Sequence, residues 1–135
     1  MVTLEQMRAS NARIPRCLPP GLVAVFVGGT SGIGESTMKQ FAKHTVRPRI
    51  YYIGRCERAA KRIAGELHAI NPTGTYHFIK ADLSLLRNVD EVSRDIKERE
   101  NSINLLFLTP GTLITGKGES PFSINTFRSL RTQPS

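Results

Sequence analysis

The stretch of sequence that decides the fold is LVAVFVGGTSGIG, residues 22–34. Its first six residues form a continuous apolar run rich in β-branched side chains, which is typical of a strand buried on both faces of a parallel sheet. Four glycines follow within seven residues, and a pattern with helical spacing then begins. A buried strand, a glycine loop and a helix in this order predict a nucleotide-binding site.

The glycines of this loop have different expected roles. Gly28 lies where the strand must turn sharply, in a backbone conformation that glycine adopts at least cost. Gly32 lets the backbone approach a diphosphate, and Gly34 lets the new helix pack close to the strands. The helix N-terminus directs N–H groups and a positive dipole end at the phosphates, and Thr30 and Ser31 add hydroxyl donors. The alternative is a tight strand–helix turn without a ligand.

Strands alternate with helices after the loop, which predicts right-handed βαβ units and an α/β fold with a parallel sheet of about four strands and three main helices. The first helix is expected to end near His44, and Ser84 is expected to cap the third. The expected strands are residues 22–27, 49–53, 76–79 and 103–108. The apolar helix faces are expected to hold Ile33, Met38, Phe41 and Ala42, then Ala60, Ile63, Ala64, Leu67 and Ile70, then Leu85, Val89, Val92 and Ile96.

Three segments of different character follow one another along the chain. Residues 1–20 form an N-terminal helical appendage, in which Thr3 and Gln6 have the spacing of a capping box. Residues 21–111 carry the alternating pattern and form the nucleotide-binding domain. Residues 112–135 are polar and lack periodicity, so we expect an irregular tail there.

Charge and cysteine usage narrow the class of protein. The 135 residues carry 19 lysines and arginines against 11 acids, a net charge of +8. This balance predicts an anionic partner, either a nucleotide, a nucleic acid or an acidic membrane, unless acidic residues in a missing C-terminal half compensate for it. Cys17, Cys56 and the histidines lack metal-ligand spacing, and no apolar run reaches the roughly 20 residues that cross a bilayer. We expect a cytoplasmic protein without a metal site, a membrane partner or a secretory signal.

A second clue to the ligand lies at the end of the second expected strand. NAD-binding folds usually place an acid there to bind the ribose 2′-hydroxyl, whereas NADP binders place a basic group. This sequence has Gly54 and Arg55, with Arg58, Lys61 and Arg62 close behind. A guanidinium group can bind a 2′-phosphate, so the sequence predicts NADP as the cofactor. The alternative is an ordinary solvated arginine.

Asp82 follows the third expected strand at the same edge of the sheet. Its carboxylate can accept a hydrogen bond from an adenine amino group. The alternative is an aspartate that helps Ser84 to cap the next helix, and both roles are compatible.

Together these motifs resemble the short-chain dehydrogenase/reductase family, in a fungal branch common in specialised metabolism. The resemblance covers about residues 21–111. GGTSGIG at 28–34 is similar to the family's glycine motif, and residues 54–55 resemble the NADP-type end of its second strand. ADLS at 81–84 resembles its adenine-side aspartate, and LTPG at 108–111 occupies the place of its Asn-Asn-Ala-Gly motif.

The resemblance implies the N-terminal half only of a Rossmann-like parallel sheet. It also implies hydride transfer between NADPH and a carbonyl or alcohol of a small-molecule substrate. Leu108 and Thr109 replace the two asparagines of the family's fourth motif. The expected cofactor-binding residues are Gly28, Thr30, Ser31, Gly32, Ile33, Gly34, Arg55, Asp82, Leu83, Thr109 and Gly111.

The family's catalytic serine and Tyr-x-x-x-Lys pair would come later than Ser135, so we expect no catalytic residue in this chain. Residues 76–80, YHFIK, have the Tyr-x-x-x-Lys spacing. Proton transfer needs both side chains on one face, as one helical turn provides. This segment is an expected strand, in which the two residues lie about 13 Å apart. The pair is therefore interpreted as structural.

Three functions remain open from the sequence. The first is a family oxidoreductase that lacks its catalytic half and whose own activity is unsettled. The second is a non-catalytic nucleotide-binding or regulatory protein. The third is a basic nucleic-acid binder, which only the charge favours, because no basic stretch is interleaved with aromatic residues. An exposed edge on the fourth strand also predicts homo- or hetero-oligomers.

Overall fold

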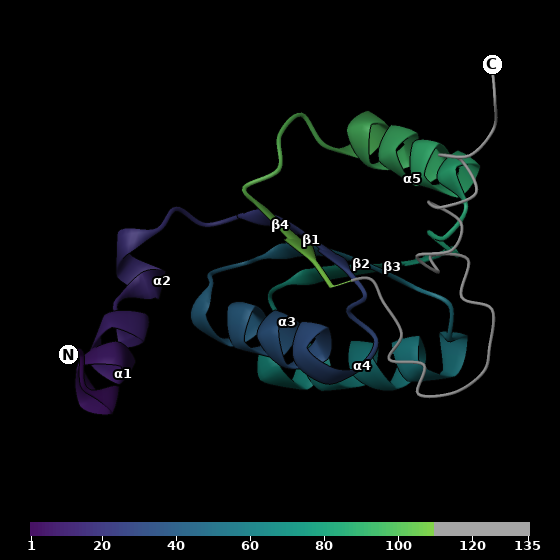
Figure 1. Ribbon diagram of the computed structural model, residues 1–135. Coiled ribbons are helices and arrows are strands. Elements are labelled where there is room, and N and C mark those ends of the chain that lie inside the picture. Colours follow the sequence, from purple (N-terminus) through teal and green to yellow (C-terminus); the bar gives the residue numbers. More distant parts are fainter. Residues whose placement is uncertain (110–135) are drawn as a thin grey trace, which may run out of the picture.

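Strands and helices alternate from Val23 to Leu108, and a helical segment precedes them (Figure 1). The computed structural model describes residues 1–109. The elements are α1 (Leu4–Ala12), α2 (Ile14–Cys17), β1 (Val23–Val27), α3 (Gly32–His44), β2 (Arg49–Gly54), α4 (Glu57–Ile70), β3 (Thr75–Lys80), α5 (Leu86–Arg99) and β4 (Leu105–Leu108).

The four strands form one parallel sheet in the order β3-β2-β1-β4. The chain moves outward from β1 to β3 and then returns to the other side of β1, so the strand order reverses between β1 and β4. Ligands of such folds bind at the carboxyl ends of the strands beside this reversal. The predicted α/β fold, with half of a Rossmann-like sheet and three main helices, is confirmed.

One face of the sheet is covered by α3 and α4, and the other by α5 (Figure 1). Successive strand residues point to opposite faces, so β1 and β2 supply buried side chains to both. The predicted double-sided burial of the first strand is confirmed. The core under α3 and α4 contains Ala24, Phe26, Met38, Ala42, Ile50, Tyr52, Ala60, Ile63 and Leu67. The core under α5 contains Val23, Val25, Tyr51, Ile53, Val92 and Ile96.

Several sequence predictions about the helices and the last strand are wrong. Ile70, expected on the apolar face of α4, is the last residue of that helix and is 40% exposed. Ile33 is 74% exposed in the first turn of α3 and does not contribute to the core. Ser84 does not cap α5: Leu85 occupies the N-cap position without a side-chain hydrogen bond and is exposed. The fourth strand begins only at Leu105, because the Asn104 side chain turns back to accept a 2.9 Å hydrogen bond from the Val23 N–H.

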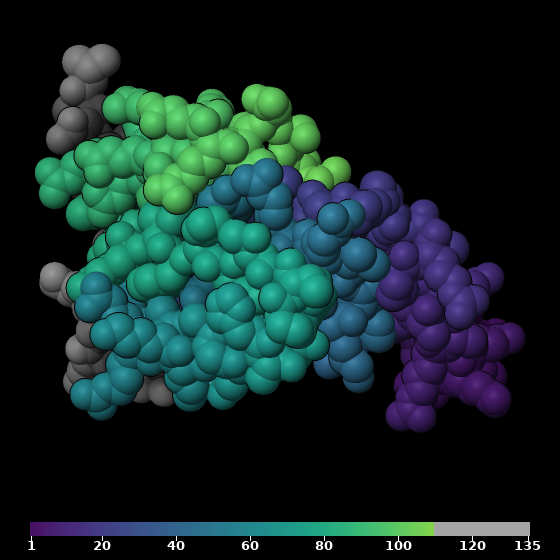
Figure 2. All heavy atoms as spheres, turned by 180° about the vertical axis from the view of Figure 1, so that it is seen from behind, coloured from purple at the N-terminus to yellow at the C-terminus, as the bar shows by residue number. Residues whose placement is uncertain are grey.

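The N-terminal segment has its own local stabilisation. The predicted capping box is present, since Thr3 Oγ1 accepts from the Gln6 N–H at 3.2 Å and Gln6 Oε1 accepts from the Thr3 N–H at 2.9 Å. No residue of α1 or α2 is buried. Figure 2 shows this segment, in purple, projecting from the side of the molecule. Among residues 1–109, no helix is both long and apolar enough to cross a membrane.

Candidate nucleotide-binding site

The turn after β1 has the backbone that the sequence predicts. Gly28 has φ +85°, in the left-handed region, and its N–H donates to the Ile53 carbonyl at 3.1 Å. A Cβ at Gly28 would lie 2.5 Å from the Thr109 carbonyl oxygen. Both the backbone angle and the close approach of Thr109 therefore require glycine at this position.

Gly34 is buried in the first turn of α3. A Cβ there would lie 2.5 Å from the Gly28 carbonyl oxygen and 2.9 Å from Thr109 Oγ1. The predicted role of Gly34, close packing of the helix on the strands, is confirmed. The packing sets the start of α3 directly beside the end of β1.

Gly32 differs from its two neighbours in the motif because its surroundings are open. It has φ +59°, and no atom lies within 4 Å of the position that a Cβ would take. Packing within residues 1–109 therefore does not require a glycine here. Open space in front of a left-handed backbone fits the predicted approach of a diphosphate.

The N-terminus of α3 is uncapped, in contrast to that of α1. Ser31 is the N-cap residue, but its side chain makes no capping hydrogen bond. The first helical hydrogen bond joins the Glu35 N–H to the Ser31 carbonyl at 3.4 Å, so the preceding amides lack intrahelical partners. Free amides and a positive helix dipole at an exposed turn favour an anionic group.

Glu35 is an acid in the first turn of α3, yet its charge is already paired. Its Oε1 lies 2.7 Å from the Arg62 guanidinium and 3.1 Å from Lys39 Nζ. Burial works to raise the pKa of the Glu35 carboxyl, but hydrogen bonds from Arg62 and Lys39 outweigh it and hold the pKa below its usual value. The negative charge is thus neutralised on the α4 side, away from the glycine loop.

Thr30 joins the glycine loop to the end of β2. A Cβ at Gly54 would lie 2.6 Å from the Thr30 side chain, so the two residues are in close contact. The sheet hydrogen bonds continue past β2 and β3, since the Ala81 N–H donates to the Gly54 carbonyl at 3.0 Å. These contacts bring three segments that are separate in sequence to one edge of the sheet.

A cavity of about 410 Å³ lies at this edge and is open to solvent. The cavity brings together two of the predicted cofactor-binding residues, Arg55 and Asp82. Its lining residues are Arg55, Lys80, Ala81, Asp82 and Asn88.

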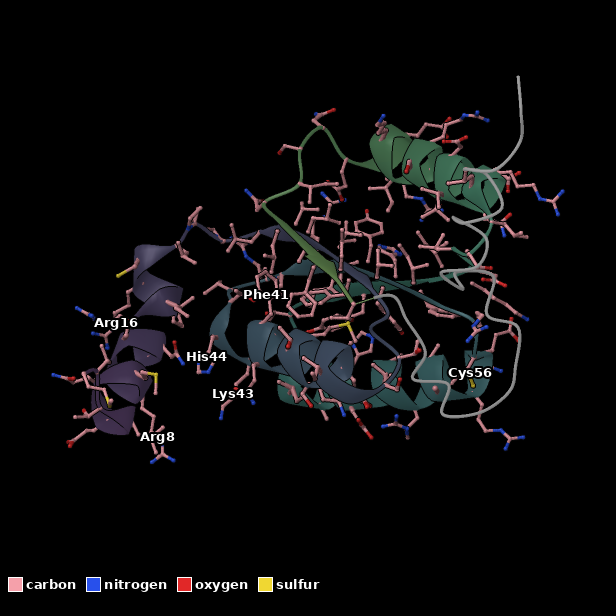
Figure 3. All side chains as sticks on the ribbon, viewed as in Figure 1. Arg8, Arg16, Phe41, Lys43, His44 and Cys56 are labelled. Atoms are coloured by element: carbon pink, nitrogen blue, oxygen red, sulfur yellow. The ribbon has the colours of Figure 1, made fainter. Side chains whose placement is uncertain are left out.

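Arg55 is exposed at the end of β2, and no ion pair joins it to a carboxylate of residues 1–109. Arg62, by contrast, is paired with Glu35 and Glu66, so of these two arginines only Arg55 offers a free cation. Cys56 follows as the N-cap of α4. Figure 3 shows it at the opposite end of the molecule from the labelled residues that end α3.

Asp82 is held in a local turn. Its Oδ1 accepts the Ser84 N–H at 3.0 Å, and its carbonyl accepts the Asn88 amide at 2.8 Å. Hydrogen bonds from Ser84, and to a lesser extent the charge of Arg55, hold the pKa of the Asp82 carboxyl below its usual value. Asp82 therefore organises the loop before α5, which leaves its adenine role as a prediction.

Lys80 is the residue of this cavity that sequence reasoning missed as a binding group. The only feature of Lys80 that stands out in the sequence is its Tyr-x-x-x-Lys spacing to Tyr76. A usable signal was its position at the end of β3, directly beside Gly54 at the end of β2. In a parallel sheet these strand ends meet at one edge.

Thr109 contributes to the site by bonding the end of β4 to the end of β1. Its N–H and Oγ1 both donate to the Val27 carbonyl, at 2.9 Å and 3.2 Å. It thereby ties β4 to the end of β1 in the place where the family has an asparagine. Leu83 packs against the core under α5. Gly111 lies outside the described residues.

Tyr76 and Lys80 do not form a catalytic pair. Both lie on β3, and the Tyr76 hydroxyl donates to the Asn71 carbonyl at 2.6 Å. Burial raises the pKa of the Tyr76 hydroxyl, which is opposite to what a proton donor activated by a lysine needs. Lys80 Nζ lies 3.7 Å from Glu57 Oε1 instead. The predicted strand at this segment is confirmed, and the absence of a catalytic role for the pair stays a prediction.

The chain belongs to the short-chain dehydrogenase/reductase family of oxidoreductases. The sequence pattern described as "short chain dehydrogenase" matches residues 22–129, most of the chain. An oxidoreductase of Emericella nidulans is 44% identical over 132 residues, which cover 97% of this chain and 39% of that protein. A short-chain dehydrogenase/reductase of Stachybotrys chartarum is 33% identical over 130 residues, covering 86% of this chain and 36% of that protein. The chain thus spans less than two fifths of the length of these relatives.

Solved structures agree on the fold. The L-sorbose reductase of Gluconobacter frateurii, complexed with NADPH and L-sorbose, matches with a TM-score of 0.62 and 25% identity, over 75% of this chain and 36% of that one. The RhlG/NADP complex of Pseudomonas aeruginosa matches with a TM-score of 0.63 and 24% identity, over 78% of this chain and 40% of that one.

Proposed function

We propose that the protein is an NADP-dependent oxidoreductase that transfers hydride between NADPH and a carbonyl or alcohol of a small molecule. Residues 1–109 supply the part of the site that holds the adenosine and diphosphate. The proposal includes a role in specialised metabolism and a cytoplasmic setting, as the resemblance of the sequence motifs implies; the relatives support the oxidoreductase class. When bound, the nicotinamide supplies the hydride chemistry.

Different residues of the chain would bind different parts of the cofactor. The exposed amides of the first α3 turn, with the hydroxyls of Thr30 and Ser31, would hold the diphosphate. Arg55 would hold the 2′-phosphate, and Asp82 with Leu83 would border the adenine. Gly28, Gly34 and Thr109 would shape the loop without contributing a charge, and Ile33 and Gly111 complete the predicted set.

The observation that carries the proposal is the contrast among the three motif glycines. Gly28 and Gly34 are required by contacts inside the fold, whereas Gly32 faces open space beside an uncapped helix terminus. The left-handed φ of Gly32 favours glycine by itself, so the features that support a ligand are the open space in front of Gly32 and the free amides beside it. A bound diphosphate accounts for both features.

Isothermal titration of the chain with NADPH and NADH tests the proposal. We expect NADPH to bind more tightly, and Arg55→Ala to lose roughly tenfold or more of NADPH affinity while NADH affinity changes little. Arg94→Ala on α5 is the matched control, because Arg94 carries the same charge, is exposed and does not line the cavity. Equal affinities of the parent chain for the two cofactors would contradict NADP selectivity, and no binding of either would contradict the dinucleotide site.

A non-catalytic nucleotide-binding protein is the second candidate. It is favoured by one observation: Tyr76 and Lys80 lie on β3, the Tyr76 hydroxyl is bonded to the Asn71 carbonyl, and residues 1–109 contain no other Tyr-x-x-x-Lys pair. NADPH oxidation with a panel of carbonyl compounds separates the candidates. Turnover by the 135-residue chain supports the oxidoreductase, and binding without turnover supports the second candidate.

The oligomer predicted from the edge of the fourth strand remains a proposal. Within residues 1–109, β4 pairs on one side only, with β1, and its Leu106 and Leu108 are more than half exposed. An unpaired apolar strand favours association. Light scattering of the purified chain measures its mass, and a monomer at all concentrations would contradict the prediction.

A further inference from the structure

The cavity beside Arg55 holds a second cation, Lys80, whose one ion pair among residues 1–109 is an exposed contact with Glu57. We propose that Lys80 is a second ligand for the 2′-phosphate of the cofactor and that Glu57 competes with the phosphate for it. The inference rests on the proposed function, because it assigns the specificity of the same site to a further residue. Nothing in the glycine motif or at the end of β2 indicates this role.

The sheet register places the two cations together. Gly54 pairs with Lys80 across β2 and β3, and the Ala81 N–H bonds to the Gly54 carbonyl at 3.0 Å. Arg55 and Lys80 therefore leave the ends of neighbouring strands, and both line the same cavity of about 410 Å³. Among residues 1–109, no other lysine or arginine lines this cavity.

The charges in the cavity match a doubly charged ligand better with Lys80 than without it. A ribose 2′-phosphate carries between about −1.5 and −2 charges at neutral pH, by analogy with other phosphate monoesters. Asp82 contributes a negative charge to the cavity, so Arg55 alone would leave the lining neutral. Adding Lys80 makes the lining positive by one charge.

Lys80 is free to move toward a ligand. Its only ion pair among residues 1–109 is the contact of 3.7 Å with Glu57, and both side chains are exposed, by 59% and 63%. Exposed pairs at such distances contribute little to stability. A phosphate oxygen can therefore replace the Glu57 carboxylate at small cost, since a lysine on a flexible stem can reach either partner.

Removing the charge of Glu57 should affect phosphate binding in the opposite direction to removing the charge of Lys80. Glu57 is the first residue of α4, 3.7 Å from Lys80 Nζ, and its carboxylate both offsets the Lys80 charge and would repel a phosphate bound to Lys80. Removing that charge is expected to strengthen binding of the phosphorylated ligand. Removing the Lys80 charge is expected to weaken it.

The test compares 2′,5′-ADP with ADP, two ligands that differ in the position of one phosphate, by titration calorimetry on the 135-residue chain. Lys80→Gln is expected to lower the preference for 2′,5′-ADP roughly three- to tenfold, and Lys80→Arg to retain it. Glu57→Gln is expected to raise the preference about twofold, an effect that disappears in the double variant with Lys80→Gln. Lys97→Gln, in the last turn of α5, is the matched control and leaves the preference unchanged.

The possible results distinguish a failure of the proposed nucleotide site from a failure of the role of Lys80. Failure of the parent chain to bind either nucleotide would overturn the proposed function and the inference with it. A preference for 2′,5′-ADP that survives Lys80→Gln, or falls equally in Lys97→Gln, would overturn the role of Lys80 and leave the proposed function intact. Circular dichroism of each variant checks that the sheet is folded, and Lys80→Arg keeps the test valid if Lys80→Gln is unstable.

Discussion

The two ends of the sheet use the same kinds of side chains for different purposes. At the amino end, Glu100 accepts from Arg49 at 2.6 Å and from the Tyr51 hydroxyl at 2.7 Å, and its side chain is 7% exposed. At the carboxyl end, Arg55 and Lys80 line an open cavity with at most one weak ion pair among residues 1–109. Charges that are satisfied internally stabilise the fold, whereas charges left available can bind a ligand.

Two glycines, one at each end of the sheet, also differ in their expected purpose. Gly21 and Gly32 both have positive φ and open surroundings, but Gly21 precedes β1 at the amino end and Gly32 starts α3 at the carboxyl end. Figure 3 marks the same two ends, with Lys43 and His44 at one and Cys56 at the other. Equivalent changes at the two ends should therefore have different consequences for nucleotide binding.

The largest effect is expected from Gly34→Val, which should prevent stable folding. The new side chain would collide with the Gly28 carbonyl and with Thr109, both of which hold β1 and β4 in place. The loss of unfolding free energy should be several kcal/mol, in the range of about 4 kcal/mol or more that marks exceptional substitutions. Urea denaturation measures it. Gly65→Ala on α4 is the control, because its Cβ meets nothing within 4 Å, and equal losses in the two variants would contradict the packing role of Gly34.

The next effect is expected from Gly32→Val, which should abolish nucleotide binding while the fold survives. A side chain at φ +59° costs about 1–2 kcal/mol of strain and occupies the place of the diphosphate. Gly21→Val introduces similar strain at the amino end and should keep parental affinity. Calorimetry with NADPH on both variants decides the comparison. If Gly32→Val binds like Gly21→Val, the loop is only a turn.

A smaller effect, on stability alone, is expected from Glu100→Gln. The substitution weakens the hydrogen bonds from Arg49 and Tyr51 at the amino end, which should lower the unfolding free energy by roughly 1–3 kcal/mol. NADPH affinity should not change, because the carboxyl end is untouched. A selective loss of NADPH binding in a fully folded variant would contradict the division between the two ends.

The smallest effect is expected from Tyr76→Phe. Its hydroxyl bonds the Asn71 carbonyl, so its removal should cost about 1 kcal/mol in thermal or urea unfolding. Neither NADPH affinity nor any turnover should change, because Tyr76 is at the amino end of β3. Turnover in the parent chain that disappears in this variant would restore Tyr76 as a proton donor.

Much of the fold was predictable because it depends on local patterns. The apolar run of residues 22–27, the helical spacing in α3 to α5 and the capping box at Thr3 are each set by near neighbours in the chain. The need for glycine at positions 28 and 34 was equally predictable, since a sharp turn and a close helix always demand it. Family membership followed from the same residues, and residues 22–129 bear it out.

The tertiary structure alone decided which charges remain available for a ligand. Arg62 and Arg55 are seven residues apart and chemically alike, but α3 brings Glu35 into an ion pair with Arg62, while no acid of residues 1–109 forms an ion pair with Arg55. The proposed role of Lys80 depends on the sheet register that sets it beside Gly54. The physical reason is that ion pairing and burial depend on distances between segments far apart in the sequence, whereas turns and periodicity depend on bonds between neighbours.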